Sequence, residues 1–235
     1  MEATTRDRRI RPAPLAFLLG SAGLAAFFIL APGVDLWISG LFHDGARDFY
    51  LNGTLWVQFF YHLVPPLAAA IALGLLALLA YNLVRKRAPG PFNTRVVLFL
   101  LAALAVGPGL VVHTVFKDQW GRARPRDIVR FGGDKTFTPA FVISDQCDRN
   151  CSFVAGHPSV PFYLMAFALV ARRRRRLLFA GAIAFGALVG LGRIVQGAHF
   201  LSDVVFSGIF VFLVAYLLFR FAFRLDRHCA ETEPG

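Results

Sequence analysis

The stretch VVLFLLAALAVGPGLVVHTVFKDQWGRARP, residues 96–125, decides how this chain folds. Residues 96–116 are mostly apolar and are long enough to cross a bilayer, which takes about 20 apolar residues. Lys117 follows directly, and Arg124 and Pro125 come after six more residues. A span that ends in fixed cations predicts an integral membrane protein with a polar site at the membrane surface.

The composition of the whole chain also favours a membrane protein. Of its 235 residues 57% are hydrophobic, and 25 are Phe, a composition typical of membrane proteins. The formal net charge is +11, but the cations cluster at the ends of apolar runs and are not spread over a soluble face. We therefore expect the bilayer as a partner and no nucleic acid.

Apolar runs separated by polar segments predict six transmembrane helices. They occupy residues 15–31, 55–84, 96–116, a run that ends at 171, 177–192 and 200–223. Basic clusters follow the second run at 85–87 and the fourth run at 172–176, and such clusters mark the cytoplasmic side. A cleaved signal peptide is the alternative for the first run, although no clear small-residue cleavage site follows it.

The expected fold class is an all-α integral membrane protein with six transmembrane helices and a long periplasmic loop between helices 3 and 4. We expect one membrane domain at 15–225, with cytoplasmic tails at 1–14 and 226–235. This topology places residues 117–157 and 193–199 on the same external side. The expected location is a bacterial inner membrane, crossed several times, with the site facing the periplasm. Pro65 and Pro66 predict a kink in the second helix.

The three cysteines fit that arrangement. Cys147 and Cys151 lie close together in the external loop, where an oxidising periplasm would favour a disulfide. A zinc site is the alternative, but no second cysteine pair or flanking histidine completes it. Cys229 is expected to be cytoplasmic and free.

A histidine and a carboxylate four residues apart are the centre of the predicted site. His199 and Asp203 would share one helix face, where a carboxylate can fix the imidazole tautomer and leave the other nitrogen free to attack or to take a proton. A buried histidine satisfied by a nearby acid is the alternative. Lys117, Arg124 and Arg193 fall on the same side of the membrane, and three cations around an imidazole predict a bound phosphate.

A second histidine begins the fourth apolar run. Gly156 and His157 would lie in a helix that starts near residue 152 or 153, whose first amides can bind phosphate oxygens. His157 would then suit protonation of a leaving alcohol. His113 is expected to be a satisfied helix-end histidine, and Tyr61 an aromatic anchor at the membrane interface.

Three segments together resemble the type 2 phosphatidic acid phosphatase (PAP2) superfamily. Residues 117–125 match its first motif, a lysine, six residues and Arg-Pro, and 193–203 match its third, an arginine, five residues, a histidine, three residues and an aspartate. Gly192 precedes the third motif where Ser is commoner. The second motif usually reads Pro-Ser-Gly-His, whereas residues 154–157 read Val-Ala-Gly-His.

The resemblance implies a phosphatase that needs no metal and no other cofactor. His199 would be the nucleophile that forms a phosphohistidine, Asp203 its orienting partner, and His157 first the acid and then the base. The implied phosphate-binding positions are Lys117, Arg124, Arg193, Gly156 and Ala155. Because Ala155 lacks the usual hydroxyl donor, either a nearby serine, Ser152 or Ser159, compensates or the protein is weakened or altered.

The substrate is expected to be a lipid phosphate. Residues 131–153 are most similar to the bacterial lipid A phosphatases of this family, which makes lipid A the favoured substrate over undecaprenyl diphosphate and phosphatidylglycerophosphate. Four loop cations, Arg122, Arg126, Arg130 and Lys135, either bind a headgroup with several phosphates or form an ordinary solvated loop. Alternatives of another class are a lipid phosphotransferase, a transporter and a lipid-binding protein without turnover.

Overall fold

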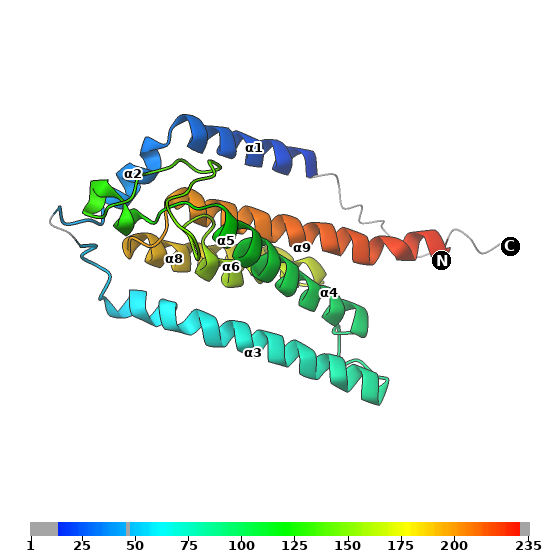
Figure 1. Cartoon of the computed structure of the whole chain (residues 1–235). Helices are drawn as coiled ribbons and strands as arrows, with labels where there is room; N and C mark the ends of the chain where they lie inside the picture. The colour runs from blue at the N-terminus through cyan, green and yellow to red at the C-terminus, as the bar shows by residue number, and fades with distance from the viewer. Residues whose placement is uncertain (1–13, 46–47, 231–235) are drawn as a thin grey trace.

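A computed structural model describes residues 14–45 and 48–230, which form a bundle of helices without any strand (Figure 1). The cytoplasmic tail predicted at 1–14 lies almost entirely outside the described residues, as does the second half of the tail predicted at 226–235. The helices are α1 Pro14–Leu30, α2 Gly33–Gly40, α3 Leu55–Arg85, α4 Thr94–Leu104, η1 Ala105–Phe116, α5 Lys117–Gln119, η2 Pro125–Asp127, η3 Val129–Phe131, α6 Gly156–Tyr163, α7 Met165–Val170, α8 Arg175–Val195 and α9 Leu201–Ala230.

Several of these helices can cross a membrane, in agreement with a multi-pass membrane protein. Within the described residues four segments are long and apolar enough: Leu55–Arg85, Thr94–Gln119, Arg175–Val195 and Leu201–Phe223. The pair α1 and α2 bends by 78° and raises the number to five if it counts as one span. The fourth predicted run forms α6 and α7, which together make a shorter apolar helix of between 10 and 17 residues. The count of six spans therefore stays a prediction.

The third span carries the chain to the first motif. The side chain of Asn93 accepts a hydrogen bond of 2.9 Å from the amide of Val96, which caps the start of α4. The helix widens into the π-helical segment η1 at Ala105, and Pro108 lies inside it. α5 then begins at Lys117, so this cation stands at the end of the span, as the sequence predicts. The second span, α3, continues through Pro65 and Pro66 without a break.

The helix α6 lies in the middle of the bundle. It packs against α3, α8, α9 and η1, and all but one of its residues are buried. Two glycines of α8 allow neighbouring helices to approach closely. A Cβ at Gly186 would lie 2.3 Å from the ring of Phe162 of α6, and one at Gly190 would lie 2.2 Å from the side chain of Val204 of α9. The expectation that the fifth run makes close helix contacts therefore holds at these two positions.

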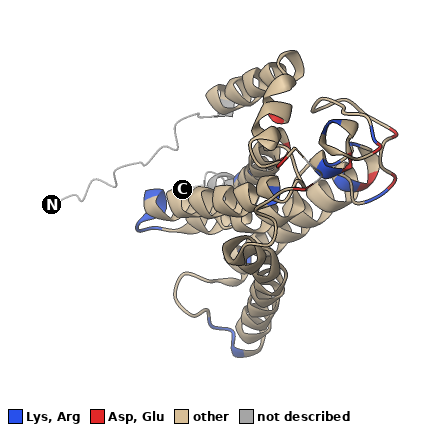
Figure 2. Cartoon of the chain, turned by 90° about the vertical axis from the view of Figure 1, so that its left-hand side faces the viewer, with Lys and Arg blue, Asp and Glu red and all other residues tan. Residues whose placement is uncertain are grey.

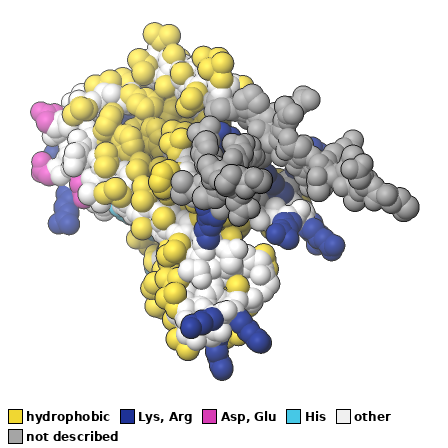
Figure 3. Space-filling model, turned by 90° about the vertical axis from the view of Figure 1, so that its right-hand side faces the viewer, with side chains coloured by type: hydrophobic (Ala, Val, Ile, Leu, Met, Phe, Trp, Pro, Cys, Tyr) yellow, Lys and Arg dark blue, Asp and Glu magenta, His cyan; other side chains and the backbone are white. Residues whose placement is uncertain are grey.

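Charged residues lie mainly in the loops and at the helix ends (Figure 2). At the end of the bundle where α3 leads into α4, Lys and Arg side chains gather beside apolar flanks (Figure 3). Large apolar side chains are exposed on α1, α3 and α8, as expected for surfaces that face lipid. The long loop between α5 and α6 lies at the opposite end, next to the start of α9 (Figure 1).

Candidate active site

His199 lies just before α9 with only 1% of its surface exposed. Its Nδ1 is 2.8 Å from the carbonyl oxygen of Ser152 and 3.7 Å from Oδ2 of Asp203. In the neutral imidazole Nδ1–H therefore donates to the Ser152 carbonyl, which leaves the lone pair on Nε2. Nε2 is buried and has no hydrogen-bond partner among the described residues. This tautomer is suited to nucleophilic attack by Nε2. The hydrogen bond to Nδ1 is made by the backbone carbonyl of Ser152 and not by Asp203.

The surroundings of His199 keep its imidazole neutral. Burial lowers its pKa from 6.5 to about 3, the neighbouring Asp203 carboxylate opposes that shift, and the positive charge of Arg193 adds to it. At neutral pH the ring therefore carries no proton on Nε2.

Asp203 is held by three donors and is completely buried. Its Oδ1 accepts a hydrogen bond of 2.5 Å from Nη1 of Arg122, and its Oδ2 accepts one of 2.5 Å from the hydroxyl of Ser152. The amide of Phe200 also donates to Oδ2 at 2.8 Å. Such a set of donors favours the ionised carboxylate, which places a fixed negative charge beside the imidazole.

The three predicted cations lie near one another. Lys117 Nζ donates to Oδ1 of Asn150 at 2.6 Å, and Arg124 Nη2 donates to the backbone oxygen of Asn150 at 2.7 Å. Arg193 bonds to the side chain of Gln196 through Nη1, while its buried Nε has no partner among the described residues. The charges of Arg124 and Arg193 both act on Lys117. Because like charges repel one another, and Lys117 and Arg193 are both buried, this arrangement favours a bound anion.

The second histidine shares an aromatic partner with this cluster. His157 stacks on Tyr61 with ring centroids 4.8 Å apart and an interplanar angle of 14°. The guanidinium carbon of Arg193 lies 4.9 Å from the centroid of the same ring. The ring of Tyr61, predicted as an interfacial anchor, therefore also contacts two of the predicted site residues, His157 and Arg193. No spacing rule links a residue of α3 to the three motifs, so the sequence could not reveal this contact.

Gly156 is the first residue of α6, three or four residues later than the expected helix start. A Cβ at this position would lie 2.9 Å from Cε1 of His113 and 3.2 Å from Cε of Lys117. Only glycine leaves room for both side chains, and the amides of the first helical turn have no acceptor within the helix. His113 accordingly lies beside the cation cluster.

The position of Ala155 offers no free donor. Its side chain is buried, and its amide donates a hydrogen bond of 3.0 Å to the backbone oxygen of Asp203. The hydroxyl of Ser152 is bound to Asp203, and that of Ser159 donates to the backbone oxygen of Gly156 at 2.5 Å. The idea that one of these serines replaces the missing hydroxyl is therefore wrong in this arrangement.

The four loop cations do not form one headgroup site. Arg122 is completely buried and belongs to the network around Asp203, so both earlier interpretations of this residue are wrong. Arg126 lies 3.7 Å from a carboxylate oxygen of Asp127, and Lys135 lies 3.8 Å from one of Asp134. These exposed pairs offset the positive charge of the loop.

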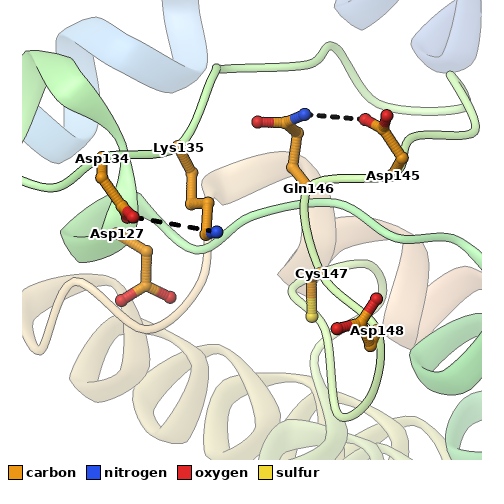
Figure 4. A pocket seen from close by; sticks show the side chains of 7 residues that line it. All are labelled: Asp127, Asp134, Lys135, Asp145, Gln146, Cys147 and Asp148. Atoms are coloured by element: carbon orange, nitrogen blue, oxygen red, sulfur yellow. Dashed lines mark hydrogen bonds and ion pairs between the residues drawn. The ribbon is translucent and has the colours of Figure 1, made fainter.

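The same loop encloses a pocket of about 320 Å³ that is separate from the motif residues (Figure 4). Its lining comprises Asp127, Asp134, Lys135, Asp145, Gln146, Cys147 and Asp148. Four carboxylates against one lysine repel a phosphate, so this pocket does not favour the predicted ligand. No group of three or more His, Cys, Asp or Glu side chains in the described part of the chain could hold a metal ion.

A disulfide joins Cys147 to Cys151, with 5.7 Å between the Cα atoms. The turn that it closes is attached to the end of the third span. The amide of Cys151 donates to the backbone oxygen of Lys117 at 2.9 Å, and the amide of Asn150 donates to Asp118 at 3.2 Å. The disulfide turn thereby supplies Asn150, the partner of two site cations.

Comparison with known proteins agrees with this geometry. Residues 95–227, which include all three motifs, match the PAP2 superfamily. The chain is 39% identical over 208 residues to a lipid A 4'-phosphatase of Francisella tularensis subsp. novicida, covering 84% of this chain and 90% of that protein. A lipid A 4'-phosphatase of Rhizobium leguminosarum is 38% identical over 106 residues, which cover 45% of this chain and 46% of the relative. No solved structure matches the chain significantly. With its motifs brought together and most of its length shared with such a relative, the chain belongs to the PAP2 superfamily.

Proposed function

We propose that this protein is a membrane lipid phosphatase that works through a covalent phosphohistidine. The observation that carries the proposal is the state of His199, whose Nδ1–H is used by a backbone carbonyl while its buried Nε2 keeps a free lone pair. Lys117, Arg124 and Arg193 supply the positive charge that stabilises a phosphoryl group in transfer.

The first step forms a bond between Nε2 of His199 and phosphorus. The bond from phosphorus to the lipid oxygen breaks at the same time. His157, which takes up one proton from solvent when the phosphate dianion binds, gives that proton to the lipid oxygen. His157 then accepts a proton from water, whose oxygen attacks the phosphohistidine. The P–N bond breaks, inorganic phosphate leaves, and the free imidazole is restored.

The favoured substrate is lipid A, with removal of its 4'-phosphate. The support for this choice is the relative from Francisella, named a lipid A 4'-phosphatase, which aligns with 84% of this chain. Undecaprenyl diphosphate and phosphatidylglycerophosphate are the alternative substrates. A lipid phosphate is consistent with a site at the end of a bundle whose flanks are apolar.

We infer six spans in a bacterial inner membrane, with α6 and α7 as the fourth and the long loop in the periplasm. The basic clusters at 85–87 and 172–176 would then lie in the cytoplasm, together with the tails at 1–14 and 226–235. The membrane domain would comprise residues 15–225. The disulfide of the long loop supports an oxidising compartment on that side.

Phosphate release from purified protein in detergent tests the proposal. The substrates are lipid A, undecaprenyl diphosphate, phosphatidylglycerophosphate and phosphatidic acid, each with EDTA present. We expect release from lipid A that disappears in His199→Ala and persists in His228→Ala, a histidine outside the three motifs. Full activity of His199→Ala would disprove the phosphohistidine, and release from another lipid alone would change the substrate.

A second candidate function, a binding protein with weakened catalysis, is favoured by Ala155 alone. The hydroxyls of Ser152 and Ser159 are both engaged elsewhere, so the phosphate lacks the serine donor usual in the family. If the protein only binds its lipid, the natural protein binds lipid A without turnover, and Ala155→Ser gains activity. Turnover of lipid A by the natural protein excludes this second function.

A further inference from the structure

A buried arginine is shared by two carboxylates behind the nucleophile. The side chain of Arg122 has no exposed surface, and neither does that of Asp35 or Asp203. Nη2 of Arg122 donates to Oδ2 of Asp35 at 2.9 Å, and Nη1 donates to Oδ1 of Asp203 at 2.5 Å. Its Nε donates to the backbone oxygen of Thr138 at 2.8 Å. Every nitrogen of the guanidinium therefore has a partner, which fixes its plane.

Asp35 extends this network to the start of α9. Its Oδ1 accepts a hydrogen bond of 2.9 Å from the amide of Ser202, and its Oδ2 accepts one of 2.5 Å from the hydroxyl of Ser202. The oxygen of that hydroxyl in turn accepts a hydrogen bond of 2.9 Å from Nη1 of Arg122. Asp35 thus holds both the arginine and the first turn of the helix that carries Asp203. The bend of 78° between α1 and α2 carries the chain to this position.

The network is connected to His199 through Ser152. On one side, the centroid of the Phe200 ring lies 4.2 Å from the guanidinium carbon of Arg122. The backbone oxygen of Arg122 accepts the amide of Ser152 at 2.8 Å. Ser152 then donates its hydroxyl to Asp203 and accepts Nδ1 of His199 on its carbonyl. Arg122 therefore fixes both neighbours of the imidazole, the carboxylate and the carbonyl.

The charge of the network also matters for the reaction. With both carboxylates ionised, the two carboxylates and one guanidinium carry one net negative charge in a buried region. When Nε2 bonds to phosphorus while Nδ1 keeps its proton, the imidazole becomes positively charged. The carboxylate of Asp203, whose Oδ2 lies 3.7 Å from Nδ1, stabilises that state, and the net negative charge of the network adds to the effect. If Asp35 lost its charge, Asp203 would be neutralised by Arg122 alone and would stabilise the imidazolium less.

We propose that Asp35 and Arg122 are positioning residues for the nucleophile, acting on His199 through Asp203 and Ser152. The proposal rests on the phosphohistidine mechanism above. Neither residue touches the predicted phosphate-binding cations in the described structure, so they should control the rate of attack and not the binding of phosphate.

The variants Asp35→Asn and Arg122→Lys test this role. Asp35→Asn keeps the shape and removes the charge, and Arg122→Lys keeps the charge and removes the planar fork. We expect kcat to fall on the order of 100-fold in each, the loss that a misplacement of about 1 Å causes. KM and the inhibition constant of inorganic phosphate should stay within about twofold, because the cation cluster is unchanged. Matched controls are Asp134→Asn and Arg130→Lys, both exposed in the long loop.

Three outcomes decide the matter. A kcat within about twofold of the natural protein in both variants would overturn the positioning role. The phosphohistidine mechanism would still stand in that case, provided that His199→Ala loses activity. A parallel worsening of KM and of phosphate inhibition would also overturn it, because the two residues would then only maintain the fold. If His199→Ala retains activity, the proposed function fails first, and the role of Asp35 falls with it.

Discussion

At the scale of single residues, burial decides the chemistry of the site. His199 is surrounded by groups that exclude water, and the energetic cost of charging a buried imidazole keeps it neutral. The folded protein with a pKa of about 3 binds fewer protons than the unfolded chain with a pKa of 6.5. His199 therefore contributes stability that is fully present above pH 6.5 and is lost as the pH falls toward 3.

A titration of His199 tests this directly. We expect the ¹⁵N spectrum of histidine-labelled protein in detergent to show Nε2 of His199 unprotonated at pH 5, because its pKa lies near 3. The resonance is assigned by its absence in His199→Ala. A protonation midpoint near pH 6.5 would contradict the burial described here and leave half of the imidazole unable to attack at that pH.

The sequence predicted which residues would come together at the candidate site but not the residues that support them. The three motifs were expected on one side, and the structure brings Lys117 close to both His157 and His199. The sequence did not predict the contacts of Asp35, Arg122 and Tyr61, because their partners are far away in the sequence. Arg122, for example, pairs with residues 81 and 87 positions away. A lone arginine in a charged loop looks solvated until the fold buries it.

At the scale of helices, glycine positions decide how closely α8 can approach its neighbours. The sequence predicted close contact for this run from its Gly and Ala content, but content alone does not say which glycines are involved. Gly190 faces Val204 of α9, whereas Gly181 has no atom within 4 Å of a Cβ built on it. α8 carries Arg193, so its fit against α9 also sets the distance between that cation and His199.

The pair Gly190→Ala and Gly181→Ala separates packing from helix propensity. Alanine favours a helix over glycine by about 1 kcal/mol, but at Gly190 its methyl group would lie 2.2 Å from Val204, and overpacking costs about 1–3 kcal/mol. We expect a lower Tm and a lower rate of phosphate release for Gly190→Ala. Gly181→Ala should match or slightly exceed the natural Tm. Equal Tm values for the two variants would refute the contact.

At the scale of the whole molecule, the bundle has two chemically different ends. Basic clusters lie between α3 and α4 and between α7 and α8, and the motif residues lie at the end where α9 begins (Figure 1). The six apolar runs of the sequence form helices in the described residues, but only four of these helices, or five with the bent pair, are long and apolar enough to cross a membrane. The helix of the fourth run is short because it begins only at Gly156, within the second motif, and residues 154 and 155 still belong to the preceding loop.

Cysteine labelling in spheroplasts tests the orientation. In a Cys229→Ser background, Arg130→Cys places a thiol in the long loop and Lys86→Cys places one in a basic loop. Because basic loops stay in the cytoplasm, a maleimide that cannot cross the membrane should label position 130 in intact spheroplasts and position 86 only after lysis. The reverse pattern would invert the topology.

The ion pair between Asp35 and Arg122 also indicates how much of the chain is needed for activity. The match to the family begins at residue 95, yet Asp35, which pairs with Arg122, and Tyr61, which stacks on His157, lie upstream of it. If Asp35 positions the nucleophile as proposed, the smallest unit able to turn over substrate is wider than the matched segment. A chimera that takes only residues 95–227 from this chain should then be active only when its other parent supplies an acidic residue at the position of Asp35.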